Sequence, residues 1–236
     1  MPVAPFYFPV RRPMELDLHV HTRFSRDSRN DPGQMVETAL RRGLAGIAVC
    51  DHDAFRGVEA VRNAAPPGFL VVPGMEISTR FGHLLGLFLR EPVRTKDPFE
   101  AVAAIHAQGG LAILAHPFAR QGSVDPAFAA RLDGCEGFNA RYNRASRRRE
   151  SDSPPKALAF AREHGLAVTG GSDAHFLWEI GRGRTVLDGA RDLEDVKRAI
   201  RERRTTCRAI RTSSILNRVY SGVVRLARPK RRMPAD

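Results

Sequence analysis

The chain has 236 residues and a formal net charge of +12, with 42% hydrophobic and 27% charged residues. This length and composition suit one large globular domain or two small ones and exclude a chain that is disordered over most of its length. The three cysteines, Cys50, Cys135 and Cys207, have no CxxC spacing, so neither a disulfide framework nor a thiolate zinc cluster is indicated.

The chain carries no targeting or membrane signal in its sequence. Prolines and aromatic residues interrupt segment 1–13, where a signal peptide needs a continuous apolar region. The longest apolar stretches, such as 84–89, are far shorter than the roughly 20 residues that cross a bilayer. We therefore expect a cytoplasmic protein without a transmembrane helix.

Short apolar runs rich in β-forming residues alternate with helix-like segments, which is typical of a parallel sheet or barrel with crossover helices. The predicted strands are 14–20, 45–50, 69–73, 84–89, 111–115, 135–139, 166–170 and 184–187. The predicted helices are 33–42, 56–64, 98–108, 154–164 and 192–203. This count is near that of a (β/α) barrel, so we predict an α/β fold with one barrel domain over residues 14–205.

The C-terminal residues form a basic extension, 206–236. Nine of the twelve net positive charges lie in residues 201–236, so the charge argues only weakly for nucleic acid binding by the barrel. Apolar residues recur at helical spacing over 213–228 and predict an amphipathic helix. We expect its apolar stripe to dock on the barrel, with contact to an anionic membrane or a partner as the alternative.

Six of the eight histidines lie beside the ends of predicted strands, where a parallel barrel gathers its reactive groups. His19 and His21 are two apart on a strand, so both imidazoles point the same way and can hold one ion. His52 follows the second strand, between Asp51 and Asp53, which are supporting or helix-capping candidates. Imidazole and carboxylate ligands suit Zn, Mn, Fe or Mg and do not choose among them.

The succession ELDLHVHTRFSRDS, AVCDHD, VVPGMEIS, GHLLGL, AILAHP, EGFNAR and GGSDAH resembles the PHP (polymerase and histidinol phosphatase) family of metal-dependent phosphoesterases. The matching segments run from about Glu15 to Thr185. The resemblance implies a distorted (β/α)7 TIM-like barrel with two or three divalent ions at the carboxyl ends of its strands. It also implies hydrolysis of phosphate esters.

The resemblance further implies which residues hold the ions. The ligands of one ion are His19, His21, Glu76 and Asp173. Glu76 bridges to a second ion held by His83 and His116. A third ion is held by His52, His175 and a residue of the first loop, for which Asp27 is our choice because Ser25 is followed first by Arg26.

Such a ligand set predicts hydrolysis by a metal-bound water, without a protein nucleophile. Arg120 and Arg141 follow predicted strand ends and are the candidates for binding the phosphate of a phosphorylated small molecule. The basic stretch 141–149 should lie on the same face and attract anions.

Three alternatives stay open at this point. The same site could act as a 5'-3' exonuclease on nucleic acid, or the chain could be a non-catalytic, metal-stabilised binding or accessory module. Amidohydrolases also use an HxH pair on a barrel, but many bridge two ions with a carbamylated lysine, and none of the four lysines lies at a predicted strand end.

Overall fold

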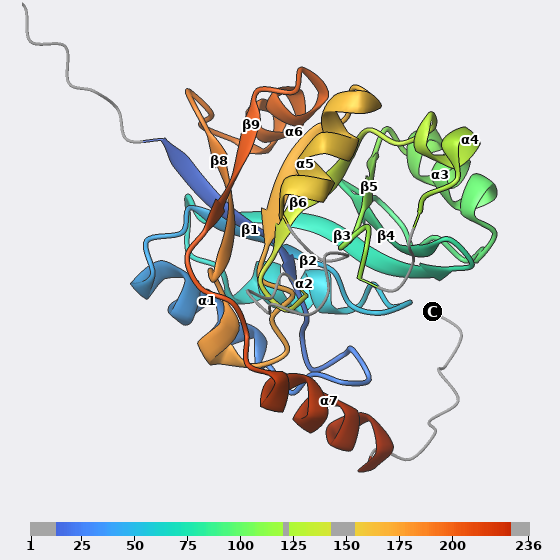
Figure 1. Cartoon of the computed structure of the whole chain (residues 1–236). Coiled ribbons are helices and arrows are strands. Elements are labelled where there is room, and N and C mark those ends of the chain that lie inside the picture. Colours follow the sequence, from blue (N-terminus) through green and yellow to red (C-terminus); the bar gives the residue numbers. More distant parts are fainter. Residues whose placement is uncertain (1–12, 120–122, 143–153, 228–236) are drawn as a thin grey trace, which may run out of the picture.

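The computed structural model describes residues 13–119, 123–142 and 154–227, and its strands form one sheet that curls into a nearly closed barrel (Figure 1). In chain order, the strands are β1 (Met14–Val20), β2 (Gly46–Val49), β3 (Leu70–Thr79), β4 (Gly82–Leu87), β5 (Leu111–Leu114), β6 (Gly134–Asn139), β7 (Ala167–Gly171), β8 (Gly183–Leu187) and β9 (Thr205–Ala209). Arg120 lies outside the described residues, and so do most of the basic stretch 141–149 and residues 228–236.

Neighbouring strands follow the order β7-β6-β5-β4-β3-β2-β1-β8-β9. Strands β1 to β3 pair in parallel, and so do β5 to β7. Strand β4 is antiparallel to β3 and β5, and β8 is antiparallel to β1 and β9. The backbone after β7 joins β1, because Asp173 N donates to His19 O at 2.8 Å and His21 N donates to Ala174 O at 3.0 Å. This closure brings the first and last ligand motifs of the chain together.

All eight predicted strands are present, and the barrel expectation is confirmed. The expectation of an all-parallel sheet is wrong for β4, β8 and β9. Strand β3 extends to Thr79 and only two residues separate it from β4, too few for the crossover that parallel strands need, so the two strands form a hairpin. Strand β9 was not predicted; it is short, largely exposed and polar. It pairs with β8 and so continues the barrel sheet past residue 205.

Most helices connect strands and pack on the outer face of the sheet, whereas α7 follows the last strand and lies at one end of the barrel (Figure 1). They are α1 (Pro32–Arg41), α2 (Gly57–Ala64), α3 (Pro98–Ala107), α4 (Pro126–Ala129), α5 (Pro154–Glu163), the short 3-10 helix η2 (Leu177–Glu179), α6 (Leu193–Arg201) and α7 (Ile215–Ala227). Asp31 and Asp97 cap α1 and α3 by accepting hydrogen bonds from backbone N–H groups, and a proline follows each cap. None of the described helices has the length and hydropathy needed to cross a bilayer.

The predicted C-terminal helix is present as α7. Most of its apolar stripe is exposed and does not pack against the barrel. Only Ser221 and Val224 of the helix are buried. Leu216, Val219 and Val223 are each more than half exposed. The helix instead lies across the end of the barrel that holds the ligand motifs, and its contacts there are largely polar.

Candidate metal centre

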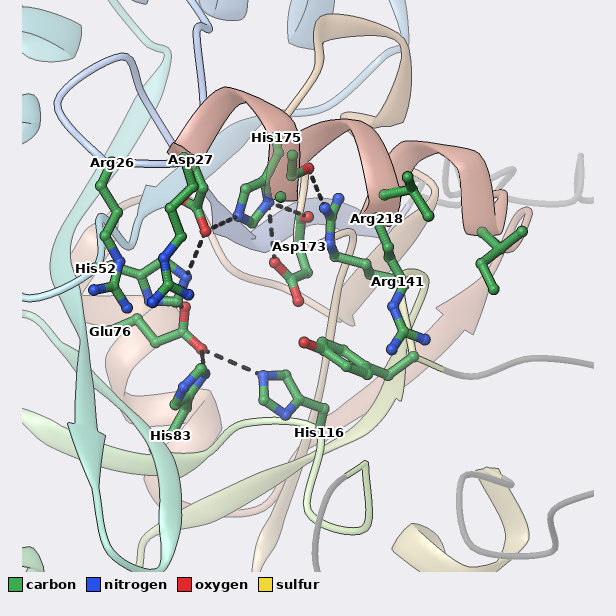
Figure 2. A pocket seen from close by; sticks show the side chains of 16 residues that line it. Arg26, Asp27, His52, Glu76, His83, His116, Arg141, Asp173, His175 and Arg218 are labelled. Atoms are coloured by element: carbon green, nitrogen blue, oxygen red, sulfur yellow. Dashed lines mark hydrogen bonds and ion pairs between the residues drawn. The ribbon is translucent and has the colours of Figure 1, made fainter. Parts of the chain in front are cut away.

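The structure brings the nine predicted ligands together at one end of the barrel, and Figure 2 draws all of them except His19 and His21. They come from β1, from the loops after β1, β2, β5 and β7, from β3 and from β4. His83 belongs to this group only because β4 is antiparallel, which puts the start of that strand beside the carboxyl ends of its parallel neighbours. Glu76 lies within β3 rather than after it, since β3 is longer than predicted.

Glu76 is the centre of the cluster and is 1% exposed. Its Oε1 atom lies 2.6 Å from His83 Nδ1 and 3.3 Å from His116 Nε2. Its Oε2 atom lies 3.3 Å from Nε2 of both His19 and His21. The Oε2 atom also lies 3.1 Å from His52 Nδ1, so the two oxygens of this carboxylate face different groups of imidazoles.

Asp173 completes the group around His19 and His21. Its Oδ1 atom lies 3.2 Å from His21 Nε2 and 3.8 Å from His19 Nε2. The two Nε2 atoms are themselves 3.1 Å apart, as expected for alternate residues whose side chains point to one face of β1. With one oxygen of Glu76, this arrangement gathers four ligand atoms around a common point.

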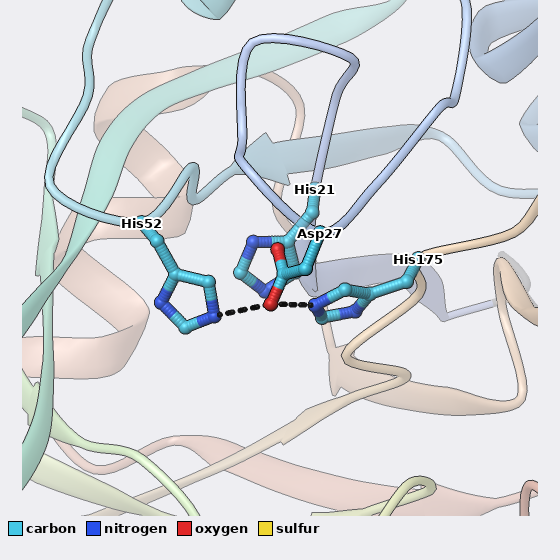
Figure 3. A group of neighbouring side chains, drawn as sticks. All are labelled: His21, Asp27, His52 and His175. Atoms are coloured by element: carbon cyan, nitrogen blue, oxygen red, sulfur yellow. Dashed lines mark ion pairs between the residues drawn. The ribbon is translucent and has the colours of Figure 1, made fainter. Parts of the chain in front are cut away.

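Asp27 holds a separate pair of histidines, shown in Figure 3. Its Oδ2 atom lies 3.3 Å from His52 Nε2 and 3.2 Å from His175 Nε2. His21 stands beside this group, since its ring centroid is 4.2 Å from that of His175. Position 27 rather than 26 thus points to the histidines, because Arg26 lies at the exposed rim.

Two polar residues of β6, which were given no role from the sequence, support the cluster. Glu136 Oε1 accepts a 3.0 Å hydrogen bond from His19 Nδ1, and Glu136 Oε2 accepts from the backbone N–H of His116 at 2.8 Å. Asn139 donates to the same carboxylate oxygen at 2.7 Å. A carboxylate on the far nitrogen of a ligating histidine fixes its ring orientation and tautomer. The only signal in the sequence was a glutamate and an asparagine within an otherwise apolar strand.

The aspartates beside the ligand motifs have structural contacts. Asp51 accepts from the N–H and the hydroxyl of Thr22, both at 2.6 Å, and so fixes the loop that follows β1. Asp53 accepts from Ser78 N at 3.0 Å and pairs with Lys96. Burial raises the pKa of Asp51 to about 6, against the hydrogen bonds from Thr22 that lower it.

Burial and mutual charge shift the titration of the ligands. Burial raises the pKa of Glu76, but His52, His83 and His19 outweigh it and hold this pKa well below its usual value. Burial lowers the pKa of His52, but Glu76 and Asp27 together raise it to about 9. Burial, helped by the neighbouring His175, lowers the pKa of His21 to about 3. The carboxylates are therefore ionised and His21 is neutral, as metal ligation requires, whereas His52 holds a proton near neutral pH that the binding of an ion would release.

The backbone is strained at two of the ligands. His116 has φ 30° and Asp173 has φ 54°, both in the left-handed region. Such conformations cluster at functional sites because the surrounding fold must hold them in place. Gly171 has a related role, since a Cβ atom there would lie 2.5 Å from His19 Cβ, so that only glycine lets β7 approach β1 this closely.

The ligand atoms fit divalent ions by their hydrogen bonding. Among the described residues, the buried atoms without a suitably placed hydrogen-bond partner are Ser78 Oγ and four atoms of this cluster: His21 Nδ1, His52 Nδ1, His83 Nδ1 and Glu76 Oε2. Buried polar atoms without a partner are costly, and a cation surrounded by imidazole and carboxylate ligands would satisfy several of them. The donor set therefore fits a metal centre.

All of the ligands except His19 and His21 line a cavity of about 380 Å³. Arg141 also lines it, but this side chain is 5% exposed and its guanidinium is engaged elsewhere. It pairs with the buried Glu179 at 3.2 Å and donates to Asn217 O and Ser221 Oγ of α7. Arg141 thus joins the site to α7. Arg120 lies outside the described residues.

Comparisons with known proteins agree with this geometry. A family model described as PHP domain matches residues 17–116, and one described as PHP-associated matches residues 155–205. An uncharacterized protein from Methanocaldococcus jannaschii is 33% identical over 178 residues, which cover 71% of this chain and 68% of the relative. A 5'-3' exoribonuclease from Haemophilus influenzae is 36% identical over 76 residues, 30% of this chain and 27% of that enzyme.

Among solved structures, a two-domain protein from Bacteroides vulgatus, described as containing a predicted PHP-like metal-dependent phosphoesterase, matches with a TM-score of 0.71 at 24% identity. The match covers 84% of this chain and 65% of that protein, so the chain spans less than two thirds of its length. At this identity the likeness shows the fold.

Proposed function

Since this chain belongs to the PHP domain family, we propose that it is a metal-dependent hydrolase of phosphate esters that acts on a small phosphorylated molecule or a nucleotide. The observation that carries the proposal is the arrangement of the ligands around one buried carboxylate, with the two oxygens of Glu76 facing different groups of imidazoles beside the cavity. We propose two or three divalent ions, with Zn, Mn, Fe and Mg as the candidates.

In this proposal, the ligands and the residues that support them have different roles. His19, His21 and Asp173 hold the innermost position, and Glu76 links it to His83 and His116. Glu136 keeps the proton of His19 on Nδ1, so that Nε2 offers its lone pair to the site. Ions held by these residues would supply a water of lowered pKa and would offset the charge of the phosphate oxygens. Ligands fixed by the barrel provide the positioning that phosphoryl transfer requires.

The cavity supports a small substrate. Its volume of about 380 Å³ lies near the lower end of the roughly 300–1,000 Å³ that small-molecule pockets occupy. Helix α7 lies over the site, where an extended nucleic acid strand would need an open groove.

Exonuclease activity on the same centre is the second candidate. It is favoured by the similarity to the 5'-3' exoribonuclease over 76 residues. The chemistry would be the same, and the difference would lie in the length of the substrate.

Metal analysis with a hydrolysis screen tests the proposal. The purified protein would be assayed on sugar phosphates, nucleotides, cyclic phosphates and short oligonucleotides. Phosphate release from monomers alone supports the leading function, and cleavage of oligonucleotides supports the second. Full metal content without hydrolysis of any ester would contradict both and favour a binding module.

Ligand variants complete this test. His19→Ala and Asp173→Ala should abolish hydrolysis while the barrel stays folded, because both side chains serve the site. His106→Ala is the matched control, since His106 is an exposed residue of α3 paired with Asp133 outside the cavity. Unchanged turnover in both ligand variants would overturn the assignment.

A further inference from the structure

Helix α7 forms one wall of the cavity that holds the ligands. Ile215, Arg218, Val219, Gly222 and Arg225 line the cavity from the helix. Figure 2 shows the helix running across the site, with Arg218 and Arg141 at one end of the pocket and Arg26 at the other. The segments matched by the family models end at residue 205, before this helix.

Polar contacts that start from the site fix the position of α7. Arg141 donates to Asn217 O at 3.4 Å and to Ser221 Oγ. Asn217 Nδ2 in turn donates to Glu179 Oε1 at 2.8 Å. Glu179 also accepts from the backbone N–H of the ligand His175 at 3.1 Å. The register of the helix is therefore set by the same residues that shape the ligand loop.

Arg218 lies close to the ligands. Its guanidinium carbon is 4.7 Å from the centre of the Tyr142 ring, and that ring is 4.3 Å from the ring of His116. Stacking on an aromatic ring orients a guanidinium and leaves its N–H groups free to donate sideways. Among the described residues, no ion pair joins Arg218 or Arg225 to a carboxylate, and both arginines line the cavity.

We propose that α7 is the substrate-binding wall of the active site, with Arg218 and Arg225 as its anion-binding residues. This inference rests on the proposed phosphoesterase function and names the residues that hold the phosphorylated substrate. Arginine binds phosphate oxygens through paired N–H groups and is weakly hydrated, which suits this role beside a cation-rich centre. Arg141 is then the anchor of the wall and not a substrate ligand.

Single substitutions in the full, metal-loaded chain test the arginines. In Arg218→Gln and Arg225→Gln, KM for p-nitrophenyl phosphate and the dissociation constant for inorganic phosphate should each rise about tenfold, the loss of one charge-assisted hydrogen bond. The effect on KM should exceed that on kcat, and Arg218→Lys should fall between wild type and Arg218→Gln. Arg131→Gln is the matched control, because Arg131 is exposed and precedes β6, at the barrel end away from the ligands.

A neutral substitution tests the wall itself. A Cβ atom added at Gly222 would meet nothing within 4 Å, so Gly222→Leu should fold normally and place its side chain toward the cavity. We expect it to raise KM for bulky phosphate esters several-fold more than KM for p-nitrophenyl phosphate.

Two outcomes separate this inference from the proposed function. Wild-type hydrolysis with Arg218→Gln, Arg225→Gln and Gly222→Leu all behaving like Arg131→Gln would overturn the inference and leave the function standing. An inactive wild type whose calorimetric binding of inorganic phosphate is weakened by Arg218→Gln would support the binding wall and contradict the function. Thermal melts and metal content accompany each variant to show that the centre is intact.

Discussion

His19 Nδ1 donates a 3.0 Å hydrogen bond to Glu136 Oε1, and both side chains are almost wholly buried. A carboxylate can only accept, so the imidazole proton is held on Nδ1 and Nε2 faces Glu76 and Asp173. The hydrogen bond to Glu136 thus fixes the orientation and the tautomer of the His19 ring, which the HxH motif alone does not determine.

Glu136→Gln should weaken metal binding about 10- to 100-fold, the usual effect of removing such a supporting carboxylate. The amide retains one acceptor for His19 but loses the charge that stabilises the imidazole proton. Competition with a metallochromic chelator measures the affinity. Glu163→Gln, at an exposed position near the end of α5, is the control and should bind ions like wild type. Equal affinities in the two variants would show that Glu136 does not support His19.

Removal of the ions should lower thermal stability. Ions present at about 100 times their dissociation constant add about 2.7 kcal/mol to the free energy of unfolding, or roughly 5–10 °C in Tm for a chain of this size. Scanning calorimetry before and after chelation, and after ions are added back, measures the change. A Tm that is indifferent to chelation would contradict a metal centre at the unsatisfied imidazoles.

Asp27→Asn should reduce the metal content by one ion and spare those around Glu76. Asp27 contacts His52 and His175, and although His52 Nδ1 also lies 3.1 Å from Glu76, that carboxylate keeps His83 and His116 as further partners. Elemental analysis of purified protein counts the ions. Asp188→Asn, an exposed carboxylate beyond β8, serves as the control. If all ions are lost in Asp27→Asn, the two groups of ligands are a single binding unit.

Arg141→Ala should destabilise the fold by about 3 kcal/mol, because it leaves the fully buried Glu179 without its cation. Denaturant unfolding measures this loss, with Arg131→Ala as the matched control. An unchanged free energy of unfolding together with a higher KM would instead make Arg141 a substrate ligand.

Glu15 of β1 contributes to the free energy of unfolding in a pH-dependent way, because it pairs with Arg184 of β8 and Arg208 of β9. Burial raises its pKa, but Arg184 and Arg208 outweigh it and lower this pKa below 4.5. A depressed folded-state pKa contributes stability that is present above pH 4.5 and is lost as the pH falls through the folded value. Glu15→Gln should therefore unfold more easily by about 1–2 kcal/mol at neutral pH, with the difference shrinking in acid. Urea unfolding of both proteins in chelator across this range is the measurement, and a pH-independent difference would contradict it.

Local patterns determined much of the fold and most of the ligands. The period-2 spacing of His19 and His21 puts both imidazoles on one face of β1, whatever the strand pairs with. The placement of His52, His116, Asp173 and His175 after apolar runs was enough to gather them, because the ends of strands in a barrel share one face.

Tertiary structure decided the rest, because it depends on pairings between distant segments. The hairpin of β3 and β4 brings His83 to the site from the start of an antiparallel strand. The pairing of β1 with the backbone after β7 and the position of β6 place Glu136 behind His19. The sequence makes Arg141 a candidate for binding phosphate, yet the fold buries it between Glu179 and α7. The amphipathic C-terminal helix lines the cavity. The spacing of side chains determines which face of one strand or helix they occupy. Contacts between residues some 40 to 120 positions apart form only when the barrel closes.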